Sequence, residues 1–149
     1  MKPRISLYAV IVFTVIVLGT VWFFSMLEDQ EPLSVFPATI NRDCAPWDGS
    51  AFTVSIPVSD GAIIATSIYQ SPDIRLPVTF SFPDETMRAG NALLLLPVGV
   101  PEPLTGKVSF PRVEQGLPVE GKFDLLTETG RQFKGSFKAE WENQPVYCG

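Results

Sequence analysis

The stretch that decides the fold is residues 119–141, which read VEGKFDLLTETGRQFKGSFKAEW. Apolar and polar residues alternate on both sides of Gly130, which is the pattern of two half-buried strands joined by a turn. A period of two places alternate side chains on opposite faces of a sheet. The positions that share the apolar face are Val119, Gly121, Phe123 and Leu125 in the first strand, and Phe133, Gly135, Phe137, Ala139 and Trp141 in the second.

Charge selects the register of this hairpin. Three registers keep the apolar faces together, and two of them place Lys134 or Lys138 directly opposite Lys122, which is unfavourable for like charges. The third sets Lys134 opposite Asp124 and Lys138 opposite Glu120. We therefore predict an antiparallel hairpin in which these oppositely charged residues are neighbours.

The same register covers two glycines with aromatic rings. Gly135 is opposite Phe123, and Gly121 is opposite Phe137. A ring from the neighbouring strand compensates for the side chain that glycine lacks in a sheet. Charge and shape thus select the same pairing.

A second hairpin is predicted at 52–68, outward from this stretch. Apolar residues alternate with threonine and serine up to Ser59-Asp60-Gly61, which is a turn signal. Gly61 supplies the positive φ of a three-residue loop with a bulge. Pairing Val58 with Ala62 then sets Ile56 opposite Ile64, Val54 opposite Thr66, and Phe52 opposite Ile68, so that the apolar side chains share one face.

The remaining segments also indicate strands. Residues 74–82 alternate without a break in the apolar set, although Pro77 cannot donate a ladder hydrogen bond and so indicates an edge strand or a bulge. Residues 92–98 hold four consecutive leucines, which fit a doubly covered strand or a short helix, and the neighbouring strands favour the first. With a further strand at 107–113, we predict an all-β fold: an antiparallel β-sandwich or small barrel of about seven strands.

The N-terminal residues differ in composition from the rest. Residues 5–27 carry no charge, and at 1.5 Å per residue they reach about 34 Å, enough to cross a hydrocarbon core of about 30 Å. Lys2 and Arg4 precede this run, so the positive-inside rule places residues 1–4 in the cytoplasm and the C-terminal domain outside. We predict one transmembrane signal-anchor helix at the cell membrane. A cleaved signal peptide is the alternative, but its apolar region would be shorter and small residues would follow it.

Two cysteines lie near the ends of the outer domain. Outside the cytoplasm an even number of cysteines indicates a disulfide, so we expect Cys44 to be bonded to Cys148. The alternative is a pair of free thiols. We therefore divide the chain into a stalk at 28–43, with Pro32 and Pro37, and an extracytoplasmic β domain at 44–149 that the disulfide closes.

Composition excludes several classes of function. The formal net charge is −5, and the two basic residues ahead of the apolar run leave nine basic against sixteen acidic residues. Nucleic acids and anionic membrane surfaces are bound mainly through clustered Lys and Arg, so this balance disfavours both as partners of the outer domain. The chain has no histidine, which removes the commonest general acid–base and the commonest transition-metal ligand.

No pattern indicates a nucleophile or a nucleotide site. Lys134 and Ser136 share a predicted outer face, where a solvated strand explains them better than a base and its nucleophile. The disulfide would leave no thiol for cysteine chemistry. Nucleotide-binding and Cys-x-x-Cys motifs do not occur, so we expect no cofactor.

Carboxylates offer the remaining route to chemistry. Asp84-Glu85 falls in a polar loop, and Glu120 and Asp124 have lysine partners, whereas a glycosidase needs two carboxyls across a cleft with one pKa raised. Calcium could bind oxygens from Asp43 or from Asp48-Gly49, but the spacing matches no EF-hand loop and a turn explains Asp-Gly better. We expect no catalytic residue and no metal ligand.

The sequence leads to a non-enzymatic module that binds or assembles with another protein of the envelope or cell surface. No motif resembles a family closely enough to add to this expectation. The first alternative is an enzyme that uses carboxylates, for which a cleft with two facing carboxyls would be needed. The second is a carrier or sensor for an apolar ligand, motivated by Leu93 to Leu96 and by the phenylalanines. Such a protein would need an interior cavity of roughly several hundred Å³ to hold its ligand.

Overall fold

The computed structural model describes residues 34–86, 88–142 and 145–148. The predicted transmembrane helix, at 5–27, and the predicted cytoplasmic tail lie outside these residues. Within the described part of the chain, no helix has the length and apolar character needed to cross a membrane.

The described residues form strands with almost no helix, so the predicted all-β class is confirmed. One short 3-10 turn, η1 (Ser59–Gly61), joins two of the strands. The strands are β1 (Val35–Cys44), β2 (Ser50–Pro57), β3 (Ile63–Ile68), β4 (Asp73–Ile74), β5 (Val78–Phe82), β6 (Gly90–Leu95), β7 (Glu102–Phe110), β8 (Val113–Glu114), β9 (Val119–Thr127) and β10 (Gln132–Trp141).

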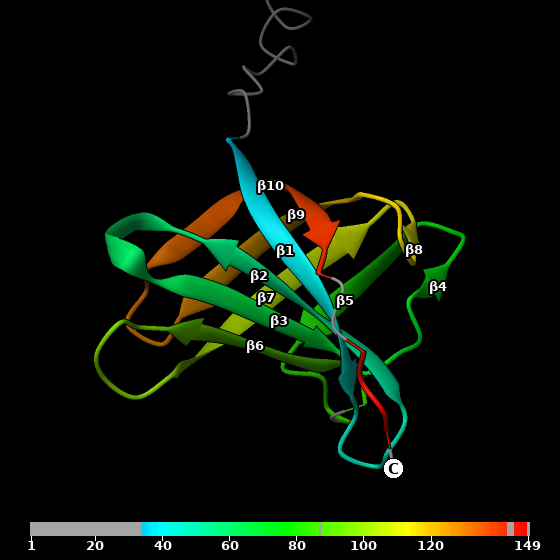
Figure 1. Cartoon of the computed structure of the whole chain (residues 1–149). Coiled ribbons are helices and arrows are strands. Elements are labelled where there is room, and N and C mark those ends of the chain that lie inside the picture. Colours follow the sequence, from blue (N-terminus) through cyan, green and yellow to red (C-terminus); the bar gives the residue numbers. More distant parts are fainter. Residues whose placement is uncertain (1–33, 87, 143–144, 149) are drawn as a thin grey trace, which may run out of the picture. The chain divides into compact units, whose positions relative to one another are not determined.

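Seven strands close into a barrel (Figure 1). The ring runs β1-β2-β3-β6-β7-β9-β10 and returns to β1 through a parallel pairing of β1 with β10; the other neighbours in the ring are antiparallel. β5 pairs with the second half of β7, on the side where β6 pairs with the first half. Of the two predicted architectures, the fold is the small barrel.

β7 changes its partner at Gly106. Its earlier residues pair with β6, and from Gly106 onward the strand pairs with β5. The φ of Gly106 is +132°, and a Cβ there would lie 2.2 Å from the backbone oxygen of Asp124 on β9. Only glycine allows this conformation together with such a close approach.

Both hairpins have the registers expected from the sequence. In β9–β10, Lys134 pairs with Asp124 and Lys138 with Glu120. Gly121 is covered by Phe137, whose ring tip would lie 2.3 Å from a Cβ at that position. In β2–β3 the paired residues are Ile56 with Ile64, Val54 with Thr66, and Phe52 with Ile68.

Side chains fill the inside of the barrel. Phe110 lies at the centre of an aromatic cluster, with its ring centroid 5.6 Å from that of Phe52, 5.8 Å from Phe137 and 6.0 Å from Phe80. These pairs meet edge to face, the geometry that aromatic quadrupoles favour. Ile40, Val54, Ile56, Ile64, Ile68 and Leu125 are fully buried around them.

The barrel begins earlier than expected. We predicted a stalk at 28–43, but residues 35–43 belong to β1, where Ala38 and Ile40 point into the core. Residues 28–33 of that prediction lie outside the described residues. The alternation in this segment is short and carries Pro37, and its pairing with β10 joins residues about 100 positions apart, which no local pattern reveals.

The longest predicted strand, at 74–82, is broken. Ile74 belongs to β4, the chain leaves the sheet at Leu76 and Pro77, and β5 begins at Val78. Leu76 is 76 % exposed although it falls in the apolar stripe of the sequence. The missing donor of Pro77 explains the break. The strand predicted at 107–113 is likewise two strands, β7 and β8.

Candidate functional site

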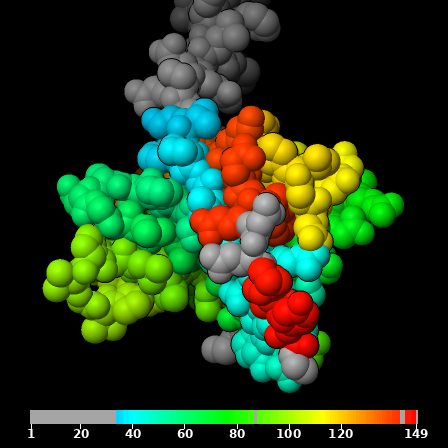
Figure 2. Space-filling model, viewed as in Figure 1, coloured from blue at the N-terminus to red at the C-terminus, as the bar shows by residue number. Residues whose placement is uncertain are grey.

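A cleft of about 390 Å³ opens at the disulfide end of the barrel. Three separate parts of the chain form its walls: the end of β1 with the start of β2, the β4–β8 pair, and the C-terminal segment. In Figure 2 the C-terminal residues, in red, lie on the surface against the cyan and teal atoms of β1 and the β1–β2 turn. The lining residues are Arg42, Asp43, Ser50, Ser71, Pro72, Asp73, Glu114, Gln115, Val146 and Cys148.

The β4–β8 pair carries one wall of this cleft. It is a two-stranded ribbon in which Asp73 is opposite Glu114 and Ile74 is opposite Val113. Ile74 and Val113 are buried in the core, so the alternation of a strand turns the two carboxylates outward. The buried pair therefore holds the charged pair in place.

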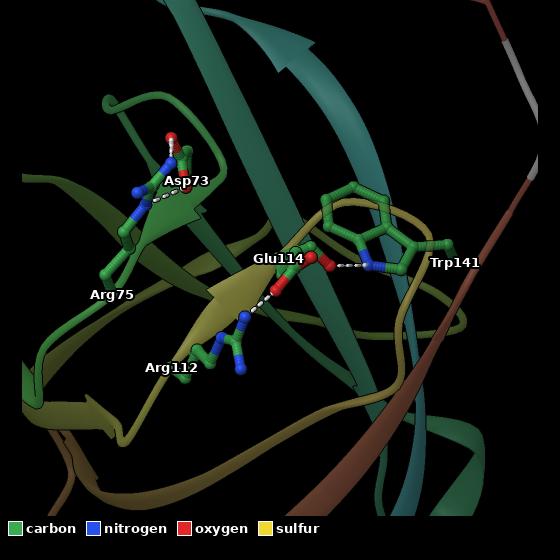
Figure 3. A network of polar contacts seen from close by, with 5 residues as sticks. All are labelled: Asp73, Arg75, Arg112, Glu114 and Trp141. Atoms are coloured by element: carbon green, nitrogen blue, oxygen red, sulfur yellow. Dashed lines mark hydrogen bonds and ion pairs between the residues drawn. The ribbon is translucent and has the colours of Figure 1, made fainter.

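Arginines compensate the facing carboxylates (Figure 3). Arg75 Nε lies 3.2 Å from Asp73 Oδ1, and Arg112 Nη2 forms an ion pair with Glu114 Oε2. The hydrogen bond from Arg75 to Asp73 and the attraction between them raise the pKa of the Arg75 guanidinium above its usual range. The indole Nε1 of Trp141 donates to the backbone oxygen of Glu114 over 3.1 Å, which ties the ribbon to the end of β10.

The opposite wall is also hydrogen-bonded. The guanidinium of Arg42 donates to the side-chain oxygen of Gln115. Asp43 accepts hydrogen bonds from the backbone N–H of Cys44 and from the hydroxyl of Thr53, both over 2.8 Å. Each of the three carboxylates that line the cleft thus has a partner, so the cleft presents a polar surface in which none of them is placed as an unpaired acid or base.

The predicted disulfide is present. Cys44 and Cys148 are joined, with their Cα atoms 5.5 Å apart. The bond ties the end of the chain to the end of β1, and Cys148 lines the cleft. The segment that forms the third wall is therefore fixed covalently.

The four charged residues of the final hairpin lie elsewhere. Glu120, Asp124, Lys134 and Lys138 are exposed on the outer face of β9 and β10 and do not line the cleft. Asp124 accepts a hydrogen bond from Gln132 Nε2 over 2.8 Å. Their role in the register is as expected, and it is separate from the cleft.

The other carboxylates considered from the sequence serve turns. Asp84 accepts hydrogen bonds from the Thr86 hydroxyl and from the backbone N–H groups of Ala89 and Arg88, which lower its pKa below the usual range. Asp48 has a φ of 62° in the turn after β1. Among the described residues, no group of three or more acidic or cysteine side chains could hold a metal ion.

Of the residues that line the cleft, sequence reasoning considered Asp43 and Cys148, each for another role, and missed the β4–β8 wall. Asp73-Ile74-Arg75 and Arg112-Val113-Glu114 are mirror images, each with opposite charges on either side of a branched apolar residue. That symmetry is a signal that two strands could pair antiparallel with complementary charges. The two segments are about 40 residues apart and each is two residues long in the sheet, so the pairing itself could not be read locally.

The sequence matches no protein-family model, and comparisons with curated proteins and with solved structures found no match. The function has to be inferred from the barrel and its cleft.

Proposed function

We propose that the chain is a single-pass membrane-anchored module whose barrel lies outside the cytoplasm and binds or assembles with another protein, without catalytic activity. The uncharged run at 5–27 and the basic residues before it support the anchor and its orientation. The Cys44–Cys148 disulfide is compatible with an oxidising compartment, where such bonds persist.

The observation that carries the proposal is the cleft at the disulfide end. Its walls come from three segments, and the disulfide and the buried Ile74–Val113 pair fix them relative to one another. A preformed site costs less conformational entropy on binding than a mobile one. Its exposed guanidinium, carboxylate and amide groups can exchange their hydrogen bonds for those of a polar partner.

The same geometry weighs against the two alternatives. A carboxylate enzyme would need two carboxyl groups facing each other across a cleft, one of them without a close partner, whereas Asp43, Asp73 and Glu114 each have a hydrogen-bonding or charged partner. An apolar carrier would need an interior cavity. The space between the strands holds the Phe52–Phe110–Phe137 cluster instead.

Site-specific photo-cross-linking in the native membrane tests this proposal. A photoreactive residue at Ser71, which lines the cleft, should capture one reproducible protein partner. The same residue at Glu128, exposed in the β9–β10 turn, is the matched control and should not. Arg42→Ala should lower the capture at Ser71, because it removes a guanidinium group that lines the cleft.

Equal capture at the two positions, or none at either, would contradict a binding role for the cleft. Loss of the chain from the membrane fraction after an alkaline wash would instead contradict the anchor. The binding role of the cleft and the membrane anchor are therefore tested independently of each other.

A further inference from the structure

The lysines of the barrel gather on one surface. The chain has five lysines, and all but Lys2 belong to the barrel. Each of these four is an exposed, outward-facing position of β7, β9 or β10, in a sheet where the three strands are neighbours. We call this surface the lysine face; it consists of Lys107, Lys122, Lys134 and Lys138, with Glu120 and Asp124 between them.

Lys122 is at the centre of the lysine face. It is opposite Ser136 on β10 and Ser109 on β7. The other three lysines are its diagonal neighbours, because Lys134 and Lys138 flank Ser136 and Lys107 precedes Ser109 by two. Diagonal positions in a sheet are about 7–8 Å apart, close enough for the four ammonium groups to repel one another.

Among the described residues, no lysine of this face forms an ion pair within 4 Å. Asp124 is opposite Lys107 and Lys134 in the ladder, and Glu120 is opposite Lys138, so two carboxylates lie among the four ammonium groups. The ion pairs found among the described residues all use arginine, namely Arg75, Arg112 and Arg131. Asp124, two residues after Lys122 on β9, accepts a hydrogen bond from Gln132 Nε2. The four lysines outnumber the two carboxylates between them, so the lysine face keeps an excess of positive charge that a partner outside the barrel could contact.

Two hollows on either side of Lys122 add hydroxyl groups to this charge. One, of about 280 Å³, is lined by Lys122, Lys138 and Ser136 together with Val35, and the carboxylate of Glu120 also lines it. The other, of about 340 Å³, is lined by Lys122 with Ser109 and Thr79. Ammonium and hydroxyl donors around a hollow of this size suit phosphate oxygens, which accept hydrogen bonds and carry the opposite charge.

The charge of the rest of the barrel has the opposite sign. The lysine face carries four positive and two negative side chains, with Glu140 beside Lys138 at its edge. The remaining described residues, Glu140 included, carry five arginines against eleven acidic residues. Such a division orients a molecule in front of an anionic surface, with its acidic part turned away. The net charge of −5 for the whole chain conceals this arrangement.

The chain between the predicted anchor and the lysine face is short. Val35, the first residue of β1, lines the same hollow as Lys122 and Lys138. Seven residues, 28–34, separate it from the end of the apolar run, and seven extended residues span at most about 25 Å. A domain of roughly 100 residues is about 30 Å across, so this length cannot carry the barrel far from a bilayer.

We propose that the lysine face is the surface that the barrel turns toward the phosphate groups of anionic lipids in its own membrane. This inference rests on the proposed anchor, which brings the barrel within reach of the headgroups. Each lysine near an anionic surface contributes about 1 kcal/mol, which corresponds to about fivefold in an equilibrium. The attraction is too weak to recruit the barrel alone and is sufficient to orient a tethered one.

Lysine acetylation in nanodiscs tests the orientation on the full-length chain. The protein is inserted into discs of phosphatidylcholine alone and of phosphatidylcholine with phosphatidylglycerol, treated with a water-soluble acetylating reagent, and read by mass spectrometry. Labelling of the four lysines should be about fivefold slower in the anionic discs. High salt should restore the rate, because it screens the attraction.

A matched pair of variants assigns the effect to the lysine face. In Lys134→Gln/Lys138→Gln, the difference between the two discs at Lys107 and Lys122 should shrink severalfold. Arg88→Gln/Arg131→Gln removes the same charge outside the lysine face and should keep the difference. Far-UV circular dichroism and an intact disulfide show that each variant is folded before it is compared.

Each other outcome overturns the inference. Equal labelling in the two discs while the chain co-elutes with them would refute the lipid contact and leave the anchor standing. Labelling that is equally slow in both discs would mean that another molecule, such as a second copy, covers the lysine face. A chain that fails to co-elute with either disc would refute the anchor itself, and the orientation with it.

Discussion

Gly121 and Gly135 lie on the inward face of the final hairpin, where each leaves room for an aromatic ring. The three atoms nearest to a Cβ on Gly135 would be ring atoms, at 2.7 Å and 3.0 Å from Phe36 and 3.1 Å from Phe123. A Cβ on Gly121 would meet the ring of Phe137 at 2.3 Å and also the backbone oxygen of Ser109 at 2.9 Å. The two glycines are alike in sequence context and differ in what surrounds them.

This difference makes a prediction for alanine at each glycine. Gly121→Ala should destabilise the barrel by about 1–3 kcal/mol, the usual cost of overpacking, because backbone cannot move aside as a ring can. Gly135→Ala should cost less, since Phe36 is only partly buried and its ring can shift. Urea unfolding of the barrel measures both, and a larger loss for Gly135→Ala would contradict this account.

Asp84 makes a prediction about pH. Its pKa is lowered by the Thr86 hydroxyl and by the N–H groups of Ala89 and Arg88, so folding favours its charged form. The stabilisation is therefore present above the unfolded pKa of about 3.9 and is lost as the pH falls through the lower folded value. An NMR titration of the Asp84 carboxyl should give a midpoint below 3.9, and the Ala89 amide signal should follow it. Asp84→Asn is the control, in which the amide signal should no longer titrate in this range.

At the scale of elements, β4 and β8 show how two very short strands stay in place. Two residues of ladder contribute little by themselves, and an isolated two-stranded ribbon is marginal in water. Ile74 and Val113 anchor the pair in the core, while Arg75 and Arg112 relieve the repulsion between Asp73 and Glu114. Exposed ion pairs of this kind contribute about 0–1 kcal/mol each, so burial is the larger effect.

Alanine substitutions at Ile74 and at Leu76 test the contribution of burial to stability in this segment. Ile74→Ala should cost about 2–5 kcal/mol, because it leaves a cavity in the core. Leu76→Ala should change stability by about 0.5 kcal/mol at most, because its side chain is 76 % exposed. The unbroken apolar stripe at 74–82 predicts similar losses at the two positions. Thermal unfolding distinguishes the two, and a large loss at Leu76 would mean that the chain does not leave the sheet there.

At the scale of the whole molecule, the barrel depends on pairings between distant segments. β1 and β10 close the ring, and the Cys44–Cys148 bond, which spans 104 positions, joins the ends of the same two regions. Burial in the core and the disulfide therefore stabilise the same junction, where β1 and β10 close the ring. The interior is filled by side chains, so the proposals for partner binding rest on the surface, at the cleft and at the lysine face.

Removing the disulfide should destabilise the barrel at this junction of β1 and β10. For a loop of about 100 residues, the loss of chain entropy in the unfolded state corresponds to about 4–5 kcal/mol, of which part is usually realised. Cys44→Ser/Cys148→Ser should therefore lower the melting temperature by several degrees, and reduction of the parent protein should do the same. Reducing agent should leave the variant unchanged. An unchanged melting temperature in the variant would mean that the ring holds its ends without the bond.

The sequence determined the features that depend on neighbouring residues. The register of the final hairpin follows from like charges at Lys122, Lys134 and Lys138 and from rings beside glycines, and these contacts connect residues close in the chain. The turn at Gly61, the all-β class and the disulfide also follow, because alternation, turn chemistry and cysteine number are local or compositional properties.

Only the tertiary structure decided between a sandwich and a barrel. Closure needs β1 beside β10 and β7 beside β9, and such pairings depend on how all the inward faces fill one interior. The cleft and the lysine face were hidden for the same reason. The walls of the cleft come from segments far apart in sequence, and Lys107 joins the three lysines of the final hairpin only through the pairing of β7 with β9. A net charge or an alternating pattern carries no information about which distant strands will lie side by side.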